Sequence, residues 1–111
     1  MATLAELRVQ IDAVDDEIVR LFEERVRLGG EVGDYKIQNG MKIFDRQRER
    51  EKLADVAGKA TTEFNKKGVK ELFEQLMAMS RKVQYRKLVE AGALGRLPFI
   101  GVEALDTQNA R

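Results

Sequence analysis

The fold is decided by residues 3–38, which read TLAELRVQIDAVDDEIVRLFEERVRLGGEVGDYKIQ and contain no proline. Their apolar residues recur three and four positions apart, the spacing of one face of an α-helix. These positions are Leu4, Leu7, Ile11, Val14, Ile18, Leu21, Leu28 and Val32. Acidic residues fill the other faces, and Asn39-Gly40 supplies a stop signal. The pattern therefore predicts one helix from about Thr3 to about Gln38.

This helix is too long for its own chain to bury. A helix of ~36 residues measures ~54 Å at 1.5 Å per residue. A compact chain of 111 residues has a diameter of roughly 34 Å. The apolar stripe must therefore end against something else, and a second copy of the chain is the simplest candidate. We expect a homodimer.

Two shorter helices should follow. Asp45 is a good N-cap for a second helix that runs to about Ala60. A third helix ends near Gly92, and its apolar positions are Val69, Leu72, Phe73, Leu76, Met77 and Val83. The expected fold class is all-α, with three helices per chain and one very long N-terminal helix.

We expect residues 1–91 to form one helical domain and residues 92–111 to form a C-terminal tail. Gly95, Pro98 and Gly101 break any helical period in this tail, although it carries several apolar side chains. The tail either packs on the helices or is the remnant of a linker in a longer protein.

Composition excludes several classes of chemistry. The chain has no His and no Cys, so disulfides, thiolate metal sites, the usual zinc ligands and Ser-His-Asp catalysis are ruled out. Lys and Arg number 20 against 19 Asp and Glu, without the basic excess typical of nucleic-acid binding. No apolar run approaches ~18 residues, and the start lacks the pattern of a secretory signal. We therefore expect a soluble cytoplasmic protein that contacts neither membranes nor nucleic acid.

Two cationic residues and two glycines lie on or beside the apolar stripe in the second half of the first helix. Arg25 lies on the apolar stripe, where an unpaired guanidinium is costly, so it needs an anionic partner. Lys36 follows at nearly the same angle and ~16 Å further along the axis. Gly29 and Gly33 lie between them. The glycines indicate either a hollow with a cation at each end or a close backbone contact with another helix, and the pattern does not decide between these readings.

The other two helices also direct polar groups inward. Glu49 lies in line with the apolar residues of the second helix, although a solvated charge run would explain it as well. Ser80 and Gln84 continue the line of apolar residues on the third helix, where a polar helix contact is the alternative. Taken together, Arg25, Lys36 and Arg48 suit a small anion that carries carboxylates.

In order and spacing, five motifs resemble the all-helical class of chorismate mutases. They are Leu-Arg-x-x-Ile-Asp at 7–12, Glu-Arg at 24–25, Glu-Val-Gly-x-x-Lys at 31–36, Asp-Arg-x-Arg-Glu at 45–49 and Ser-x-x-x-Gln at 80–84. Members of this class are free-standing or form the N-terminal domain of bifunctional chorismate mutase–prephenate dehydratases. The resemblance implies an intertwined homodimer, chorismate as substrate, prephenate as product, a place in phenylalanine and tyrosine biosynthesis, and no cofactor or metal ion.

The resemblance also implies a role for each matching residue. Arg25 and the partner chain's copy of Arg8 would bind the two carboxylates of chorismate. Lys36 and Gln84 would donate hydrogen bonds to the ether oxygen of the breaking C–O bond. Arg48 would help to hold the ligand, and Ser80 would lie near one of its carboxylates. Glu49 would accept a hydrogen bond from the ring hydroxyl, and Asp45 would support the Glu49 carboxylate.

Two other functions remain open at this level. An isochorismate-pyruvate lyase would need similar carboxylate clamps, but Glu49 favours the mutase because it is placed for the hydroxyl of chorismate. A non-catalytic helical dimer that regulates another enzyme would not need Arg25, Lys36 or Gln84. Docking on another enzyme of the shikimate pathway is compatible with either function. Since no second domain follows, we expect neither dehydratase activity nor regulation by phenylalanine.

Overall fold

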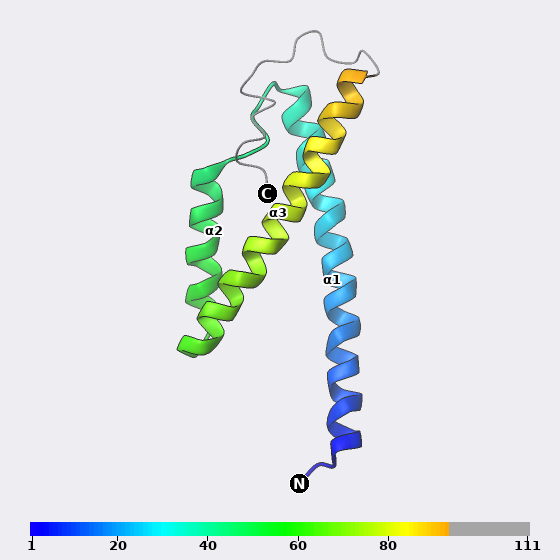
Figure 1. Cartoon of the computed structure of the whole chain (residues 1–111), viewed down its shortest axis with the longest axis vertical. Coiled ribbons are helices and arrows are strands. Elements are labelled where there is room, and N and C mark those ends of the chain that lie inside the picture. The colour runs from blue at the N-terminus through cyan, green and yellow to red at the C-terminus, as the bar shows by residue number, and fades with distance from the viewer. Residues whose placement is uncertain (94–111) are drawn as a thin grey trace.

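The computed structural model describes residues 1–93, and these form three α-helices joined by short connections (Figure 1). They are α1 (Leu4–Gln38), α2 (Arg46–Lys59) and α3 (Glu63–Ala93). Residues 1–93 contain no β-strand. The all-α class and the long N-terminal helix are therefore confirmed. The tail expected at 92–111 lies outside the described residues from position 94 onward, and its first two residues continue α3.

Each helix begins at a side chain that accepts a hydrogen bond from a backbone N–H of the first turn. Thr3 and Glu6 form a reciprocal capping box: the Glu6 N–H donates to the Thr3 hydroxyl over 3.1 Å, and the Thr3 N–H donates to the Glu6 carboxylate over 2.9 Å. The Asp45 carboxylate accepts from the Arg48 N–H over 3.0 Å, and Thr62 plays the same part for α3. Such caps satisfy backbone donors that have no partner inside the helix.

Helix α3 holds the molecule together. It packs against α1 on one side and α2 on the other, whereas α1 and α2 make no backbone-level contact with each other (Figure 1). The apolar core along these two contacts is small. Among the described residues its buried hydrophobic members are Ile43, Val56, Met77, Leu88 and Ala91.

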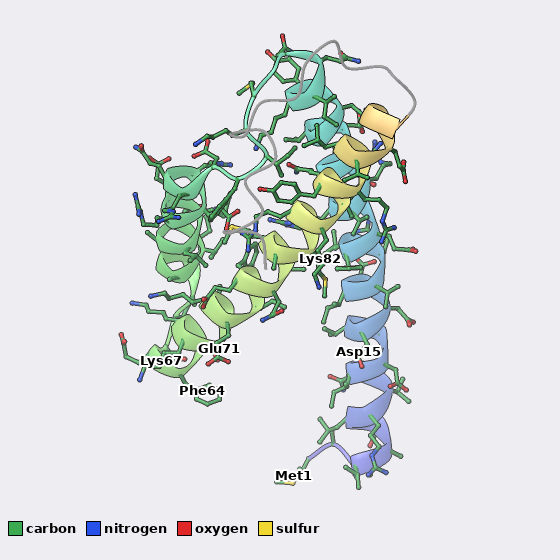
Figure 2. The ribbon with its side chains drawn as sticks, turned by 45° about the horizontal axis from the view of Figure 1, so that its top comes forward. Met1, Asp15, Phe64, Lys67, Glu71 and Lys82 are labelled. Carbon is green, nitrogen blue, oxygen red and sulfur yellow. The ribbon has the colours of Figure 1, made fainter. Side chains whose placement is uncertain are left out.

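The first half of α1 projects away from the rest of the chain (Figures 1 and 2). The molecule is 63 Å long but only 27 by 19 Å across, and every residue from 1 to 21 is exposed. The stripe predicted from sequence is therefore bare along this half, with side chains between 46 % and 58 % exposed: Leu7, Ile11, Val14, Ile18 and Leu21. We call these five residues the α1 stripe.

Helix α1 uses a different face to pack against α3. Less exposed residues recur three or four positions apart along its second half, namely Phe22, Val26, Gly30, Gly33 and Ile37. Arg25, Gly29 and Lys36, beside this face, are also partly buried. The sequence-predicted stripe continues beside this face in Leu28 and Val32, which remain 47 % exposed. Helix α1 thus has one apolar face that its own chain covers and a second that it leaves open. None of the three described helices is long and apolar enough to cross a membrane.

Candidate active site

One open cavity of about 290 Å³ lies where the second half of α1, the start of α2 and the middle of α3 meet. Its size is near the lower end of the range for small-molecule sites, ~300–1,000 Å³. We call it the central cavity. Seven of the eight site residues predicted from sequence line it, and these are Arg25, Lys36, Asp45, Arg48, Glu49, Ser80 and Gln84.

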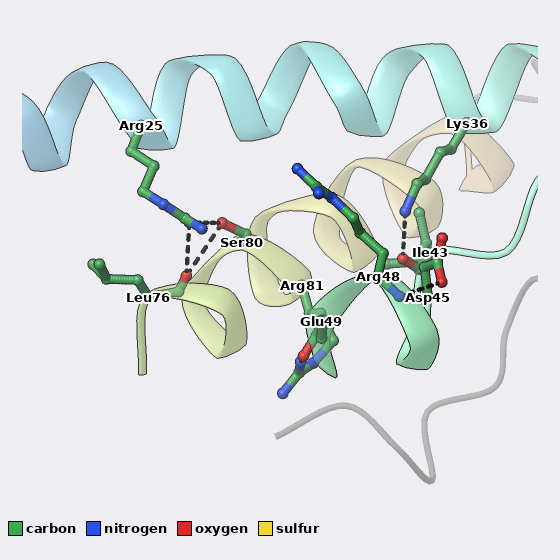
Figure 3. Close-up of polar contacts among 9 residues, drawn as sticks. All are labelled: Arg25, Lys36, Ile43, Asp45, Arg48, Glu49, Leu76, Ser80 and Arg81. Atoms are coloured by element: carbon green, nitrogen blue, oxygen red, sulfur yellow. Dashed lines mark hydrogen bonds and ion pairs between the residues drawn. The ribbon is translucent and has the colours of Figure 1, made fainter. Parts of the chain in front are cut away.

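Arg25 is held in place from α3. Its Nη1 donates to the Ser80 hydroxyl over 2.8 Å and to the Leu76 carbonyl over 3.3 Å, and the Ser80 hydroxyl donates to the same carbonyl over 3.2 Å (Figure 3). Burial lowers the pKa of the guanidinium from its ordinary value, and the charge of Glu49 opposes this. Ser80 therefore orients a half-buried cation at one end of the central cavity.

Lys36 supplies the cation at the other end. Its Nζ donates to the Ile43 carbonyl over 2.7 Å, which anchors the amine to the connection between α1 and α2 (Figure 3). Burial lowers the pKa of Lys36, and the charges of Asp45 and then Glu49 raise it. Asp45 therefore does two things: it caps α2 and it favours the charged form of Lys36.

The two glycines between these cations serve both of the purposes that the sequence left open. Gly29 lines the central cavity. Gly33 is buried against α3, where a Cβ would lie 2.9 Å from Cγ and 3.3 Å from Cα of Gln84. Gln84 itself is only 6 % exposed. The missing side chain at position 33 thus lets Gln84 approach α1 closely and fixes its side chain at the wall of the cavity.

The structure adds one residue that sequence reasoning missed. Arg81 pairs with Glu49 across the α2–α3 contact, and its guanidinium lies 4.7 Å from the centre of the Phe44 ring. Arg81 is 8 % exposed and also lines the central cavity. Its spacing from Met77 and Gln84, four and three residues, was the signal that could have placed it on the inner face of α3.

The charge of the central cavity is predominantly positive. Among the described residues its lining includes five cationic side chains, Arg25, Lys36, Arg48, Lys52 and Arg81, and two carboxylates, Asp45 and Glu49. The guanidinium of Arg48 extends from α2 toward α1 (Figure 3). Residues 1–93 hold no group of three or more acidic, His or Cys side chains that could bind a metal ion. The arrangement suits a small organic anion, because guanidinium groups bind carboxylates through paired hydrogen bonds.

Arg8 is the predicted site residue that the single chain does not bring to the cavity. It lies on the projecting half of α1, is exposed, and is ~25 Å along the axis from Arg25. Within one chain these two residues therefore cannot contact the same small ligand.

Comparison with known proteins places the predicted site residues within one protein family. The sequence model of the family described as chorismate mutase type II matches residues 7–85, which contain every predicted site residue. The chain belongs to the chorismate mutase type II family. The family match extends from the projecting half of α1 to the inner face of α3, so it includes all three helices around the central cavity.

Three relatives of this family member agree with the match. A bifunctional chorismate mutase/prephenate dehydratase of Aquifex aeolicus is 43% identical over 51 residues, 46% of this chain and 14% of the relative. A T-protein of Haemophilus influenzae is 41% identical over 49 residues, 44% of this chain and 13% of the relative. A chorismate mutase of Methanocaldococcus jannaschii is 43% identical over 47 residues, 42% of this chain and 48% of the relative. The matched part thus spans less than half of each relative. No solved structure matches the chain at a significant level.

Proposed function

We propose that this chain is a chorismate mutase, which converts chorismate to prephenate for phenylalanine and tyrosine biosynthesis. The central cavity carries the proposal, because it joins a cation at each end to the amide of Gln84 at its wall. The reaction is an intramolecular Claisen rearrangement. One C–O bond breaks and one C–C bond forms in a concerted step, without a nucleophile or an obligatory proton transfer. A protein can therefore accelerate it with restraint and electrostatics alone.

The first contribution is restraint of the substrate. Arg25, oriented by Ser80 over 2.8 Å, offers a fixed clamp for one carboxylate, and Arg48 offers a second cation from α2. Holding the enolpyruvyl arm over the ring places the reacting carbons near bonding distance. Such preorganisation can supply several kcal/mol of a barrier, ~7–11 in the best intramolecular models.

The second contribution is stabilisation of developing charge. Negative charge builds on the ether oxygen as the C–O bond stretches, so donors placed at that oxygen bind the transition state more strongly than the substrate. We assign these donors to Lys36 and Gln84, with Glu49 as the acceptor for the ring hydroxyl. Removing one such donor typically costs ~10²–10³ in kcat.

We further propose that two chains assemble into a homodimer whose sites each receive Arg8 from the partner. Support comes from the α1 stripe, which is exposed over five apolar residues on the projecting half of α1. A two-fold dimer that covers this stripe would carry Arg8 toward the other chain's cavity. Mixing inactive Arg8→Ala chains with inactive Lys36→Ala chains tests this. One site of each mixed dimer is intact, so an equal mixture should regain about a quarter of the unmodified activity, whereas no recovery contradicts the shared site.

Product analysis tests the proposed reaction. The purified chain is incubated with chorismate and, separately, with isochorismate, without added metal or cofactor, and the products are identified by NMR. Prephenate formation well above the uncatalysed rate is the expected result. Release of pyruvate from isochorismate instead would assign the chain to the lyase reaction. Turnover of neither compound would favour a non-catalytic role.

A further inference from the structure

The Arg81–Glu49 pair is the feature of the central cavity that the roles above leave unexplained. Arg81 donates from Nη1 to Oε1 of Glu49, and the two side chains are 10% and 22% exposed. They meet on the side of the cavity away from α1 (Figure 3). The pair links the first turn of α2 to α3.

Stability alone is a poor reason for such a pair. Removing two charges from water costs several kcal/mol per ion, and apolar residues of similar volume usually stabilise a core as well or better. The Nε atom of Arg81 adds to the cost, because it is buried and has no hydrogen-bond partner among the described residues. The pair also lies at the wall of the central cavity, where the position of the Glu49 carboxylate bears on a bound substrate.

The geometry instead restricts how Arg81 can move. The Phe44 ring faces the guanidinium at 4.7 Å, and the Glu49 carboxylate receives its Nη1. Glu49 can in turn serve a second partner, because a carboxylate has two oxygens and about four acceptor positions. One oxygen can be held by Arg81 while the group as a whole still accepts from a ligand.

The charge of Glu49 also acts across the cavity. It raises the pKa of Arg25 and of Lys36, against the effect of burial on both groups. The position of this one carboxylate therefore influences the cations at both ends of the site. A side chain that rotated into solvent would lose its place beside the substrate and its effect on those cations.

We propose that Arg81 is a positioning residue, whose guanidinium anchors the Glu49 carboxylate and so fixes the acceptor for the hydroxyl of the substrate ring. This inference rests on the proposed mutase activity. It assigns Arg81 an effect that passes through Glu49, without direct contact between Arg81 and the substrate.

A double-mutant cycle separates these two modes of action. Arg81→Met should lower kcat/KM by about 10- to 100-fold, the scale of a misplaced active-site group. In a Glu49→Gln background the same substitution should change kcat/KM by less than about threefold, because the group that Arg81 orients is already altered. Lys82→Met, at an exposed neighbouring position on α3, serves as the control and should retain full activity.

Thermal unfolding of every variant is measured in parallel, so that loss of fold is not read as loss of function. If Arg81→Met does not fold, Arg81→Lys takes its place in the cycle, since it keeps the charge but not the planar fork. Arg81→Lys should lower kcat/KM less than Arg81→Met does, and this decrease should likewise disappear in the Glu49→Gln background.

Two outcomes overturn the inference. Full kcat/KM in Arg81→Met shows that Glu49 needs no anchor. An equal loss with and without the Glu49 carboxylate shows that Arg81 acts on the substrate directly. Failure of the proposed function is recognised separately, because then the unmodified chain and Lys82→Met also fail to convert chorismate.

Discussion

Adding one methyl group at Gly33 should cost more in catalysis than in stability. The Cβ of an alanine at this position would lie 2.9 Å from Cγ and 3.3 Å from Cα of Gln84. Favourable carbon–carbon contacts lie at ~3.5–4.0 Å. The side chain of Gln84 can rotate to relieve the first contact, but the second involves the backbone of α3. Gln84 must therefore change rotamer, and α3 must retreat by a few tenths of an ångström.

The stability terms for Gly33→Ala nearly cancel. Alanine gains about 1 kcal/mol over glycine inside a helix, and overpacking of a close contact costs about 1–3 kcal/mol. The net loss should be about 0–2 kcal/mol, which the chain can tolerate. The catalytic effect has no such compensation. Displacing the Gln84 amide from the ether oxygen should lower kcat by about 10- to 100-fold. Complete removal of the donor sets the largest decrease in kcat that can be expected.

The assay compares kcat for chorismate with the thermal midpoint of the same preparations. Gly58→Ala and Gly68→Ala are matched controls, because a Cβ at either position meets no heavy atom within 4 Å. Both should raise stability by about 1 kcal/mol and leave kcat unchanged. If Gly33→Ala retains the unmodified kcat, the close approach of α1 is not what positions Gln84, and the reasoning is refuted.

Three further predictions concern the charges and the exposed face. Asp45→Asn preserves the cap but removes a charge that raises the pKa of Lys36, so the alkaline loss of kcat should begin at lower pH; an unchanged pH profile contradicts this. Ser80→Ala removes the 2.8 Å acceptor of Arg25 and should lower kcat/KM about tenfold, measured by steady-state kinetics with circular dichroism as the check on folding. Ile11→Glu puts a charge on the 56 % exposed α1 stripe and should weaken the dimer more than about 100-fold; sedimentation that stays dimeric at low micromolar concentration counts against the assembly.

The helices could be predicted from sequence because their signals are local. The apolar spacing of α1 and the capping side chains Thr3 and Asp45 depend only on neighbours within a turn or two, and the predicted bounds agree with the structure to about one residue. The inward placement of Arg25 and Gln84 followed from the same helical periodicity. Each of these residues lies on the same face of its helix as nearby apolar residues, and this does not depend on the position of the other helices.

The contacts between helices could not be predicted in the same way. The spacing of Arg81 from Met77 could have placed it on the inner face of α3, but only the crossing of α2 and α3 decides that its partner there is Glu49. The close contact of Gly33 likewise depends on which face α1 turns toward α3. Periodicity also did not show that the stripe through Leu28 lines the central cavity and stays half exposed, while α1 packs against α3 through a neighbouring face. The rotation of one helix relative to another depends on contacts between residues far apart in the sequence. The apolar periodicity of a single helix carries no information about those contacts.

The central claim is that Lys36 and Gln84 accelerate the rearrangement by stabilising the ether oxygen in the transition state. The kcat of Gln84→Ala with chorismate tests it most directly, because the amide is neutral and its removal changes no charge. The account predicts a kcat lower by about 10² or more, a KM changed by only a few-fold, and an intact helical fold. Full turnover in a folded Gln84→Ala chain would contradict it.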